Sequence, residues 1–129
     1  MRLTALIATM IGALGLGACV TPSIPIPPPD PTEMTFDITS TPGSGSYAVF
    51  SYPPNQNYKH ATIYVFDVNN GGGVFHLANA DDSFGPLQPL PAVAGDQVNV
   101  AIESAEQTIS RCIILRQGTQ DPNAYCPGI

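Results

Sequence analysis

The chain of 129 residues has little positive charge, with four basic residues against ten acidic ones. Charged residues make up 11% of it, well below the usual quarter for a soluble domain. Beyond position 18 the basic residues are Lys59, Arg111 and Arg116, and three separated cations cannot form the cluster that phosphate neutralisation needs. The composition therefore argues against nucleic acid as a partner, and against electrostatic attraction to anionic lipid.

Catalytic motifs are also missing. The sequence has no Gly-x-Ser-x-Gly, no His-Glu-x-x-His and no phosphate-binding loop, since the glycines at 71–73 lack a following lysine and helix. We therefore expect no enzyme activity and no cofactor. An enzyme would need one of its two histidines to meet a carboxylate in a cleft, and the residues in question are His60, His76, Asp67, Asp81 and Asp82.

The first 18 residues have the layout of a secretory signal. Arg2 gives a short positive start, an apolar stretch runs over residues 3–16, and the small residues Gly17 and Ala18 follow. The apolar stretch is interrupted by two glycines and is shorter than the roughly 20 residues that a membrane-spanning helix needs. We predict a signal peptide over residues 1–18.

The junction Leu16-Gly17-Ala18-Cys19 resembles the lipobox of bacterial lipoproteins. The resemblance implies cleavage before Cys19, attachment of diacylglycerol (and palmitate-type acyl chains) there, and anchoring in the cell envelope. Each buried methylene contributes about 0.8 kcal/mol, so two or three acyl chains hold a protein at the membrane. Residue Val20 stands where an aspartate favours retention in the inner membrane, which implies the outer membrane in a Gram-negative host.

A proline-rich tether is predicted over residues 19–33. Six prolines lie between Pro22 and Pro31, and proline fixes φ and lacks an amide donor. An extended chain rises ~3 Å per residue, so Val20 to Glu33 would reach ~40 Å. The alternative is a proline-rich docking motif for a partner, but its position directly after the anchor favours a semi-rigid spacer.

Short alternating segments then recur over residues 34–129, with turn-rich breaks between them. Residues 97–103 alternate most clearly, and residues 84–90 carry two prolines and can form an edge strand at most. No helical stripe follows the leader. We predict an all-β antiparallel sandwich of six or seven strands, drawn from residues 34–38, 47–52, 61–66, 74–78, 84–90, 97–103 and 108–116.

The runs Asp82-Ser83-Phe84 and 94–100 resemble the later half of bacterial immunoglobulin-like or fibronectin-III-like domains, where a Gly-Asp turn precedes a strand of alternating valines. The resemblance covers about 35 residues. The chain departs from antibody-type domains because it has no tryptophan and no cysteine pair at the inter-sheet spacing. The resemblance implies a sandwich and carries nothing about function.

Cys112 and Cys126 are predicted to form a disulfide. In an oxidising envelope compartment a disulfide is the simplest use of such a pair, whereas two thiols without nearby histidines make a poor metal cage. The bond would join the C-terminal tail to the last strand and stabilise the fold by about 3 kcal/mol. Lipidation of Cys19 would leave no free thiol.

A calcium site is the weakest of the candidate sites. Asp67, Asn69, Asp81 and Asp82 supply the oxygen ligands that a hard cation prefers. However, Ala78 stands where a calcium loop would have its bidentate glutamate, and Asp and Asn are common in hairpin turns. We therefore expect turns here and no resident metal.

Tyrosines supply the candidate binding surface. If outward-facing tyrosines share a face, they form a stacking platform for a sugar or a protein; the candidates are Tyr47, Tyr52, Tyr58 and Tyr64. The leading hypothesis is a lipid-anchored, non-catalytic binding or structural accessory module that engages another envelope protein. The alternative is a module that binds surface polysaccharide through these tyrosines.

Overall fold

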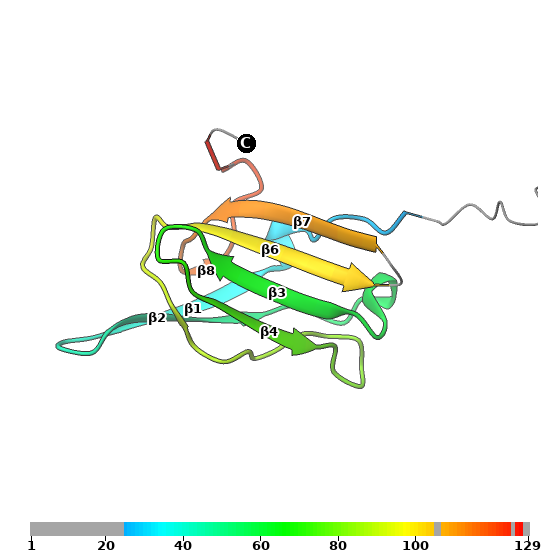
Figure 1. Cartoon of the computed structure of the whole chain (residues 1–129), viewed down its shortest axis with the longest axis horizontal. Helices are drawn as coiled ribbons and strands as arrows, with labels where there is room; N and C mark the ends of the chain where they lie inside the picture. Colours follow the sequence, from blue (N-terminus) through cyan, green and yellow to red (C-terminus); the bar gives the residue numbers. More distant parts are fainter. Residues whose placement is uncertain (1–24, 105–106, 125, 128–129) are drawn as a thin grey trace, which may run out of the picture.

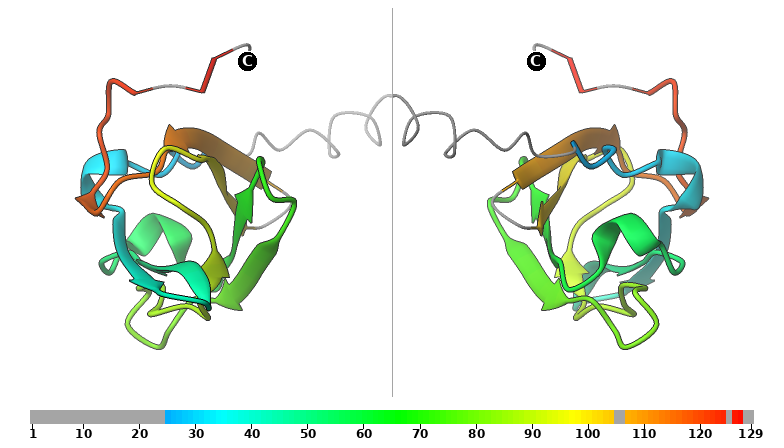
Figure 2. Two further views of the ribbon diagram at one scale, coloured as in Figure 1. Left: turned by 90° about the vertical axis from the view of Figure 1, so that its left-hand side faces the viewer. Right: turned by 90° about the vertical axis from the view of Figure 1, so that its right-hand side faces the viewer.

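The computed structural model describes residues 25–104, 107–124 and 126–127, which form two antiparallel sheets packed face to face (Figures 1 and 2). The first, the β1 sheet, contains β1 (Thr35–Thr41), β2 (Gly45–Ser51), β5 (Leu90–Pro91) and β8 (Gly118–Thr119). The second, the β3 sheet, contains β3 (Thr62–Asp67), β4 (Gly73–Leu77), β6 (Gln97–Ser104) and β7 (Gln107–Ile114).

The two sheets confirm the predicted all-β antiparallel sandwich. The β3 sheet has the order β4-β3-β6-β7 and the β1 sheet the order β5-β2-β1-β8. The valine-rich strand singled out from the sequence is β6, which lies at the centre of its sheet between β3 and β7.

The core lies between the sheets because each strand turns alternate side chains inward. Phe36 and Phe50 are directly opposite each other on β1 and β2, and their rings meet edge to face with centroids 5.0 Å apart. From the other sheet Ile63, Val65 and Val100 pack against them, all 1% exposed or less. In both sheets the apolar residues of the alternating pattern are therefore the ones that are buried.

Strand ends differ from the predicted ranges at two places. The first hairpin is longer than expected, since β1 and β2 stay paired from Thr35↔Ser51 to Thr41↔Gly45 and form an arm that projects from the sandwich (Figure 1). Residues 84–90 form only an isolated bridge, Tyr52↔Phe84, and the start of the two-residue β5. The short β8 was not expected, and it brings the described strands to eight.

The proline-rich segment packs on the domain from about Ile26 onward. Pro29 and Pro31 are buried, and the 3-10 turn η1 (Pro31–Glu33) leads into β1. The amide of Ile26 donates to the side chain of Gln107 at the start of β7, 2.9 Å away. Residues 26–33 therefore belong to the folded body, and the extended reach predicted for Val20 to Glu33 shortens accordingly. Residues 1–24, with the predicted signal peptide and Cys19, lie outside the described residues.

The predicted disulfide is confirmed. Cys112 on β7 is bonded to Cys126, with 5.6 Å between their Cα atoms. Cys126 is 6% exposed, and its sulfur lies 3.5 Å from the carbonyl oxygen of Ile113. The bond fixes the C-terminal tail against the last long strand, as the loop-closure argument requires.

Candidate functional site

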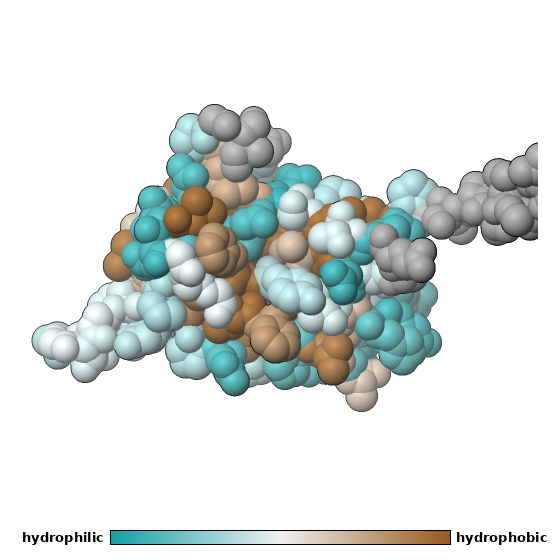
Figure 3. All heavy atoms as spheres, in the orientation of Figure 1, coloured by the Kyte–Doolittle hydropathy of each residue, from teal (hydrophilic) through white to brown (hydrophobic). Residues whose placement is uncertain are grey.

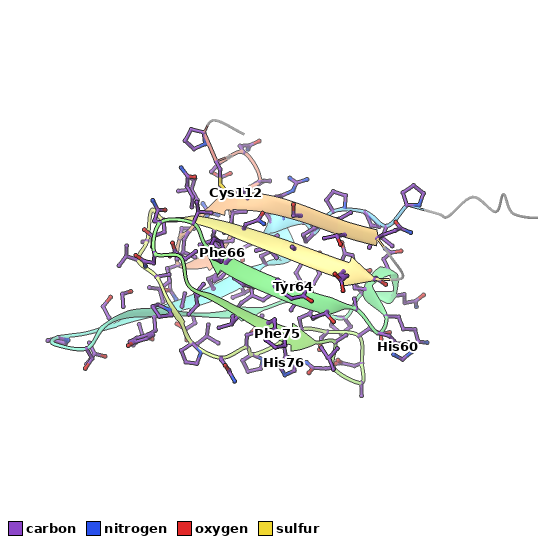
Figure 4. The ribbon with its side chains drawn as sticks, in the orientation of Figure 1. His60, Tyr64, Phe66, Phe75, His76 and Cys112 are labelled. Carbon is purple, nitrogen blue, oxygen red and sulfur yellow. A yellow bond between two sulfur atoms is a disulfide. The ribbon has the colours of Figure 1, made fainter. Side chains whose placement is uncertain are left out.

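The outward side of the β3 sheet carries an exposed apolar surface. Tyr64 and Phe66 on β3 are 40% and 43% exposed, and Phe75 and Leu77 on β4 are 71% and 65% exposed. The register places Tyr64 opposite Phe75 and Leu77 opposite Thr62, so the four side chains occupy one side of a two-stranded ribbon. We call these four residues the aromatic face; Figure 4 labels its three aromatic members.

Local packing explains how this surface is held. The rings of Tyr64 and Phe75 stack with centroids 6.0 Å apart and an angle of 29° between their planes. A Cβ atom at Gly73 would come within 3.2 Å of the Phe66 ring, so glycine at this position lets the ring lie across the neighbouring strand. Cross-strand aromatic pairs of this kind stabilise a sheet by roughly 0.2–1 kcal/mol.

The remainder of this side of the sheet is almost uncharged. Along β6 and β7 the outward positions beside the aromatic face hold mostly small or polar side chains, with Ile114 as the large apolar exception. Glu103 is the one charged residue among them; the others are Gln97, Asn99, Ala101, Thr108, Ser110 and Cys112. Figure 3 shows brown, hydrophobic spheres gathered on this side over β3 and β4. Charge depletion around exposed aromatic residues is typical of protein interfaces.

The four predicted tyrosines do not form one surface. Tyr52 and Tyr58 are 3% and 1% exposed and belong to the core. Tyr47 lies on β2 and faces outward from the β1 sheet, whereas Tyr64 faces outward from the β3 sheet on the opposite side of the sandwich. The predicted platform is therefore wrong for this set, because two of its members pack inward and the other two lie on opposite sides. Tyr64 alone belongs to the aromatic face.

The two buried tyrosines hold the proline-rich segment instead. The hydroxyl of Tyr58 donates to the carbonyl oxygen of Pro27 at 2.7 Å, and the hydroxyl of Tyr52 accepts from the amide of Asp30 at 3.1 Å. Burial raises the pKa of both phenols, and for Tyr58 the neighbouring Tyr52 raises the pKa further. Both groups therefore remain neutral at physiological pH and serve as hydrogen-bonding supports.

The calcium candidates lie apart. Asp67 ends β3, beside the tight turn at Asn69, while Asp81 and Asp82 follow the far end of β4. The five residues of β4 separate the two groups by ~16 Å at about 3.3 Å per residue. In the described ranges no group of three or more His, Cys, Asp or Glu side chains is placed to hold a metal ion. The predicted ligand set is therefore not assembled.

Asp67 has a structural environment of its own. Its carboxylate is fully buried and accepts hydrogen bonds from the amides of Asn69 and Asn70, at 2.8 and 2.9 Å. Burial, together with a hydrogen bond to the Asp96 carboxyl, raises the pKa of Asp67 above its usual value. The contact between Asp67 and Asp96 therefore joins the end of β3 to the loop before β6. A second connection is the hydrogen bond from the Gln97 amide to the side chain of Asn69, at 2.7 Å.

The histidines lie at separate positions. His60 is exposed in the turn before β3, at φ 58°, and His76 lies on the edge strand β4 (Figure 4). The Nδ1 atom of His76 is 2.6 Å from the carbonyl oxygen of Leu77. Among the described residues, neither histidine ring forms a hydrogen bond or ion pair with Asp67, Asp81 or Asp82, which is the arrangement that the enzyme alternative requires.

Two hollows lie on the described part of the surface. One of about 280 Å³ lies on the outward side of the β1 sheet, against Thr39, Tyr47, Val49 and Pro89. The other, of about 550 Å³, lies near the start of β1, and hydroxyl side chains together with Glu33 line much of it. Neither hollow has a histidine, cysteine, lysine or arginine in its lining.

Sequence reasoning did not find Phe75 and Leu77. The signal was present, because residues 74–78 were expected to return as a strand beside residues 61–66, and every second residue of a strand shares a face. The sequence did not show which side of that hairpin would be buried. Ile63 and Val65 lie on one side and Tyr64 on the other, and the side chains on both sides are apolar.

In the part of the chain that the structure describes, no helix has the length and apolar character needed to cross a membrane. Comparisons of this chain with protein-family models, with curated protein sequences and with solved structures found no match.

Proposed function

We propose that this chain is a lipid-anchored, non-catalytic binding or accessory module of the cell envelope, which engages another protein through the aromatic face. The anchor would be Cys19, in the lipobox-like sequence 16–19. Bonding of Cys112 to Cys126 agrees with an oxidising compartment. With Val20 after the cysteine, the outer membrane is the expected location in a Gram-negative host.

The observation that carries the proposal is the aromatic face. Leu77 and Phe75 are each about two-thirds exposed, and exposed aromatic residues without surrounding charge are a feature of docking surfaces. Burial of apolar area contributes about 25 cal/mol per Å², so a partner that covered these side chains would gain substantial stabilisation. A protein partner fits better than nucleic acid because the face carries no cation.

The test is photo-crosslinking in cells from the position of Tyr64. A photoreactive phenylalanine derivative there should give a stoichiometric adduct with a protein of the envelope. The same derivative at Tyr47, which is also 40% exposed but faces outward from the other sheet, is the matched control. Adducts of equal yield from both positions, or none from Tyr64, would contradict the proposal.

The anchor is tested with the Cys19→Ala variant. We expect this variant to leave the membrane fraction, to keep its leader, and to lose the crosslinked partner from position 64. Unchanged fractionation together with a free thiol at Cys19 in the wild-type chain would contradict lipidation.

A second candidate function is binding of a surface polysaccharide. The observation that favours it is the exposed Tyr64–Phe75 stack, because flat aromatic surfaces suit the apolar side of a sugar ring. Retention of the protein on envelope polysaccharide, lost in Tyr64→Ala and kept in Tyr47→Ala, would support this candidate. It differs from the leading proposal in requiring no protein adduct.

A further inference from the structure

The edge strand β4 has a free row of backbone groups beside the aromatic face. The amide of Asp67 donates to Gly72 at 2.8 Å and the amide of Ala78 donates to Ala61 at 2.9 Å, which sets the hydrogen-bonding phase of the β3–β4 pair. In an antiparallel ladder alternate residues direct their backbone groups toward the partner strand. Residues 72, 74, 76 and 78 therefore face β3, while Gly73, Phe75 and Leu77 face away from the sheet.

These outward groups are not taken up by the neighbouring loops. Among the described residues, no backbone group of a turn or loop bonds to Gly73, Phe75 or Leu77. The carbonyl of Leu77 accepts from His76 Nδ1 at 2.6 Å, and a carbonyl oxygen has a second lone pair. An open edge of this kind is a template for another strand.

We infer that β4 pairs antiparallel with β4 of a second copy of this chain, centred on Phe75, and that the two aromatic faces join into one continuous surface. This inference rests on the proposed function, because it takes the aromatic face as the surface through which the chain binds a protein. In this register Phe75 lies opposite Phe75 of the second copy, and Gly73 lies opposite Leu77. All outward-facing amides and carbonyls of both strands then meet a partner, because the free positions are symmetric about Phe75.

Charge distribution favours a second copy despite the net charge of −6. Among the described residues on the outward side of the sheet, the only charged one is Glu103, on β6. Two strand spacings, ~10 Å, separate β6 from β4, and the line along which the two β4 strands would pair is called the seam. Like charges are thus kept apart at the seam, where repulsion would otherwise oppose self-association.

Pairing also brings the exposed apolar side chains of the two β4 strands into contact along the new strand pair. The side chains of Phe75 and Leu77 project from the same side of the sheet as Tyr64, so two paired edges place four apolar side chains of β4 side by side. The result is a sheet of eight strands across both copies with no open β4 edge. Closed twofold pairing of this type limits further growth of the sheet.

The first measurement is photo-crosslinking from position 75 in cells that produce the full chain. The expected product is an adduct of twice the chain mass that contains only this protein. An adduct with a different protein alone would overturn the pairing of two copies and leave the proposed function standing. Absence of any adduct, with the derivative shown to be incorporated, would overturn both.

Two variants sharpen the test in the detergent-extracted full chain. Phe75→Pro removes an amide that faces outward, so the β3–β4 ladder keeps its own hydrogen bonds. Leu77→Asp places like charges near the seam and provides a second variant if the proline disturbs folding. We expect each to raise the dissociation constant of the dimer about 100-fold in sedimentation equilibrium.

Tyr47→Asp is the matched control, since Tyr47 is 40% exposed and faces outward from the other sheet. It should leave the dissociation constant of the dimer within about twofold of the wild type. A wild-type chain that remains monomeric at about 100 µM, or a control as strongly affected as Leu77→Asp, would overturn the inference.

Discussion

The two outward faces of the sandwich differ sharply in chemistry although they are built by the same alternation. Outward from the β1 sheet, β1 presents Thr35, Asp37, Thr39 and Thr41, a polar row that water solvates well. Outward from the β3 sheet, the corresponding positions on β3 and β4 form the aromatic face. Strand β1 therefore presents an ordinary solvated row, whereas β3 and β4 present a surface whose composition suits contact with another molecule.

The β3 sheet also inverts the usual distribution of polarity along a single strand. At the end of β3 the carboxylate of Asp67 is buried, while Phe66, one residue earlier, and Tyr64, three residues earlier, are exposed on the other side of the strand. Burial of a carboxyl group is costly unless hydrogen bonds satisfy it, and Asp67 has such bonds. Burial is thus decided by the position of a residue in the sandwich. The effect of position on stability can be measured by comparing residues of the same type at buried and exposed sites.

The largest expected effect compares two phenylalanines. Phe36→Ala removes a ring that is fully buried against Phe50, and we expect a loss of about 3–5 kcal/mol in the free energy of unfolding. Phe66→Ala, on the aromatic face, should cost no more than about 1 kcal/mol. Urea unfolding followed by circular dichroism measures both. Similar losses for the two variants would mean that the aromatic face is part of the folded core.

The disulfide gives the next largest effect. Replacement of Cys112 and Cys126 by serine should lower the free energy of unfolding by about 3 kcal/mol, because the unfolded chain regains the entropy of an open loop. Treatment of the wild-type chain with a reductant should give a similar loss. If the urea midpoint is the same with and without reductant, the tail does not contribute to stability as described.

A tyrosine pair then tests the proline-rich segment. Tyr58→Phe removes the hydroxyl that donates to Pro27, and we expect a loss of about 1 kcal/mol in the free energy of unfolding. Cleavage by a protease within residues 20–33 should also become faster, because the segment is held less firmly. Tyr47→Phe, at an exposed position, should change stability by less than about 0.5 kcal/mol. Equal protease resistance in both variants would argue against the supporting role of Tyr58.

An aspartate pair tests the pH dependence. The pKa of Asp67 is raised in the folded state above the ordinary value of 3.8, so the folded chain holds this proton more tightly than the unfolded chain. Its contribution to stability is therefore present at pH values below 3.8 and is lost as the pH rises through the raised pKa. We expect Asp67→Asn to remove this part of the decline, which begins at about pH 4.

The control for this comparison is Asp37→Asn, on the outward side of β1. It changes the same charge at an exposed site, so the decline with pH should persist in this variant. Chemical unfolding at several pH values measures the slope for the three chains. A wild-type slope that matches that of Asp67→Asn would contradict the proposed environment of Asp67.

Much of the fold could be predicted from local sequence. Residues 97–103 alternate valine and isoleucine with polar residues, and the same residues form β6. The long hairpin β1–β2 was underestimated because Ser40, Thr41 and Ser46 are polar and give no apolar period, although the backbone pairs through them. The pairing of Gly118 with Phe36 in β8 depends on residues that lie far apart in the chain, which no local pattern reports.

The candidate site was harder to predict for a related reason. Tyr52 and Tyr58 were expected on a surface, but the packing of Pro27 and its neighbours against their hydroxyls places both within the core. A phenol suits a surface and a core equally well, since its ring is apolar and its hydroxyl needs only one partner. Which role a tyrosine takes therefore depends on what lies above it in the folded chain.

The sequence by itself determined the all-β class and the partners in the disulfide, because strand periodicity and cysteine number are written in local or countable features. Only the tertiary structure decided which side of β3 and β4 faces the core. Ile63 and Val65 on one side and Tyr64 and Phe66 on the other are all apolar, so the sequence left both sides eligible for burial. The other sheet covers one side only, and the remaining side becomes the aromatic face beside an open strand edge.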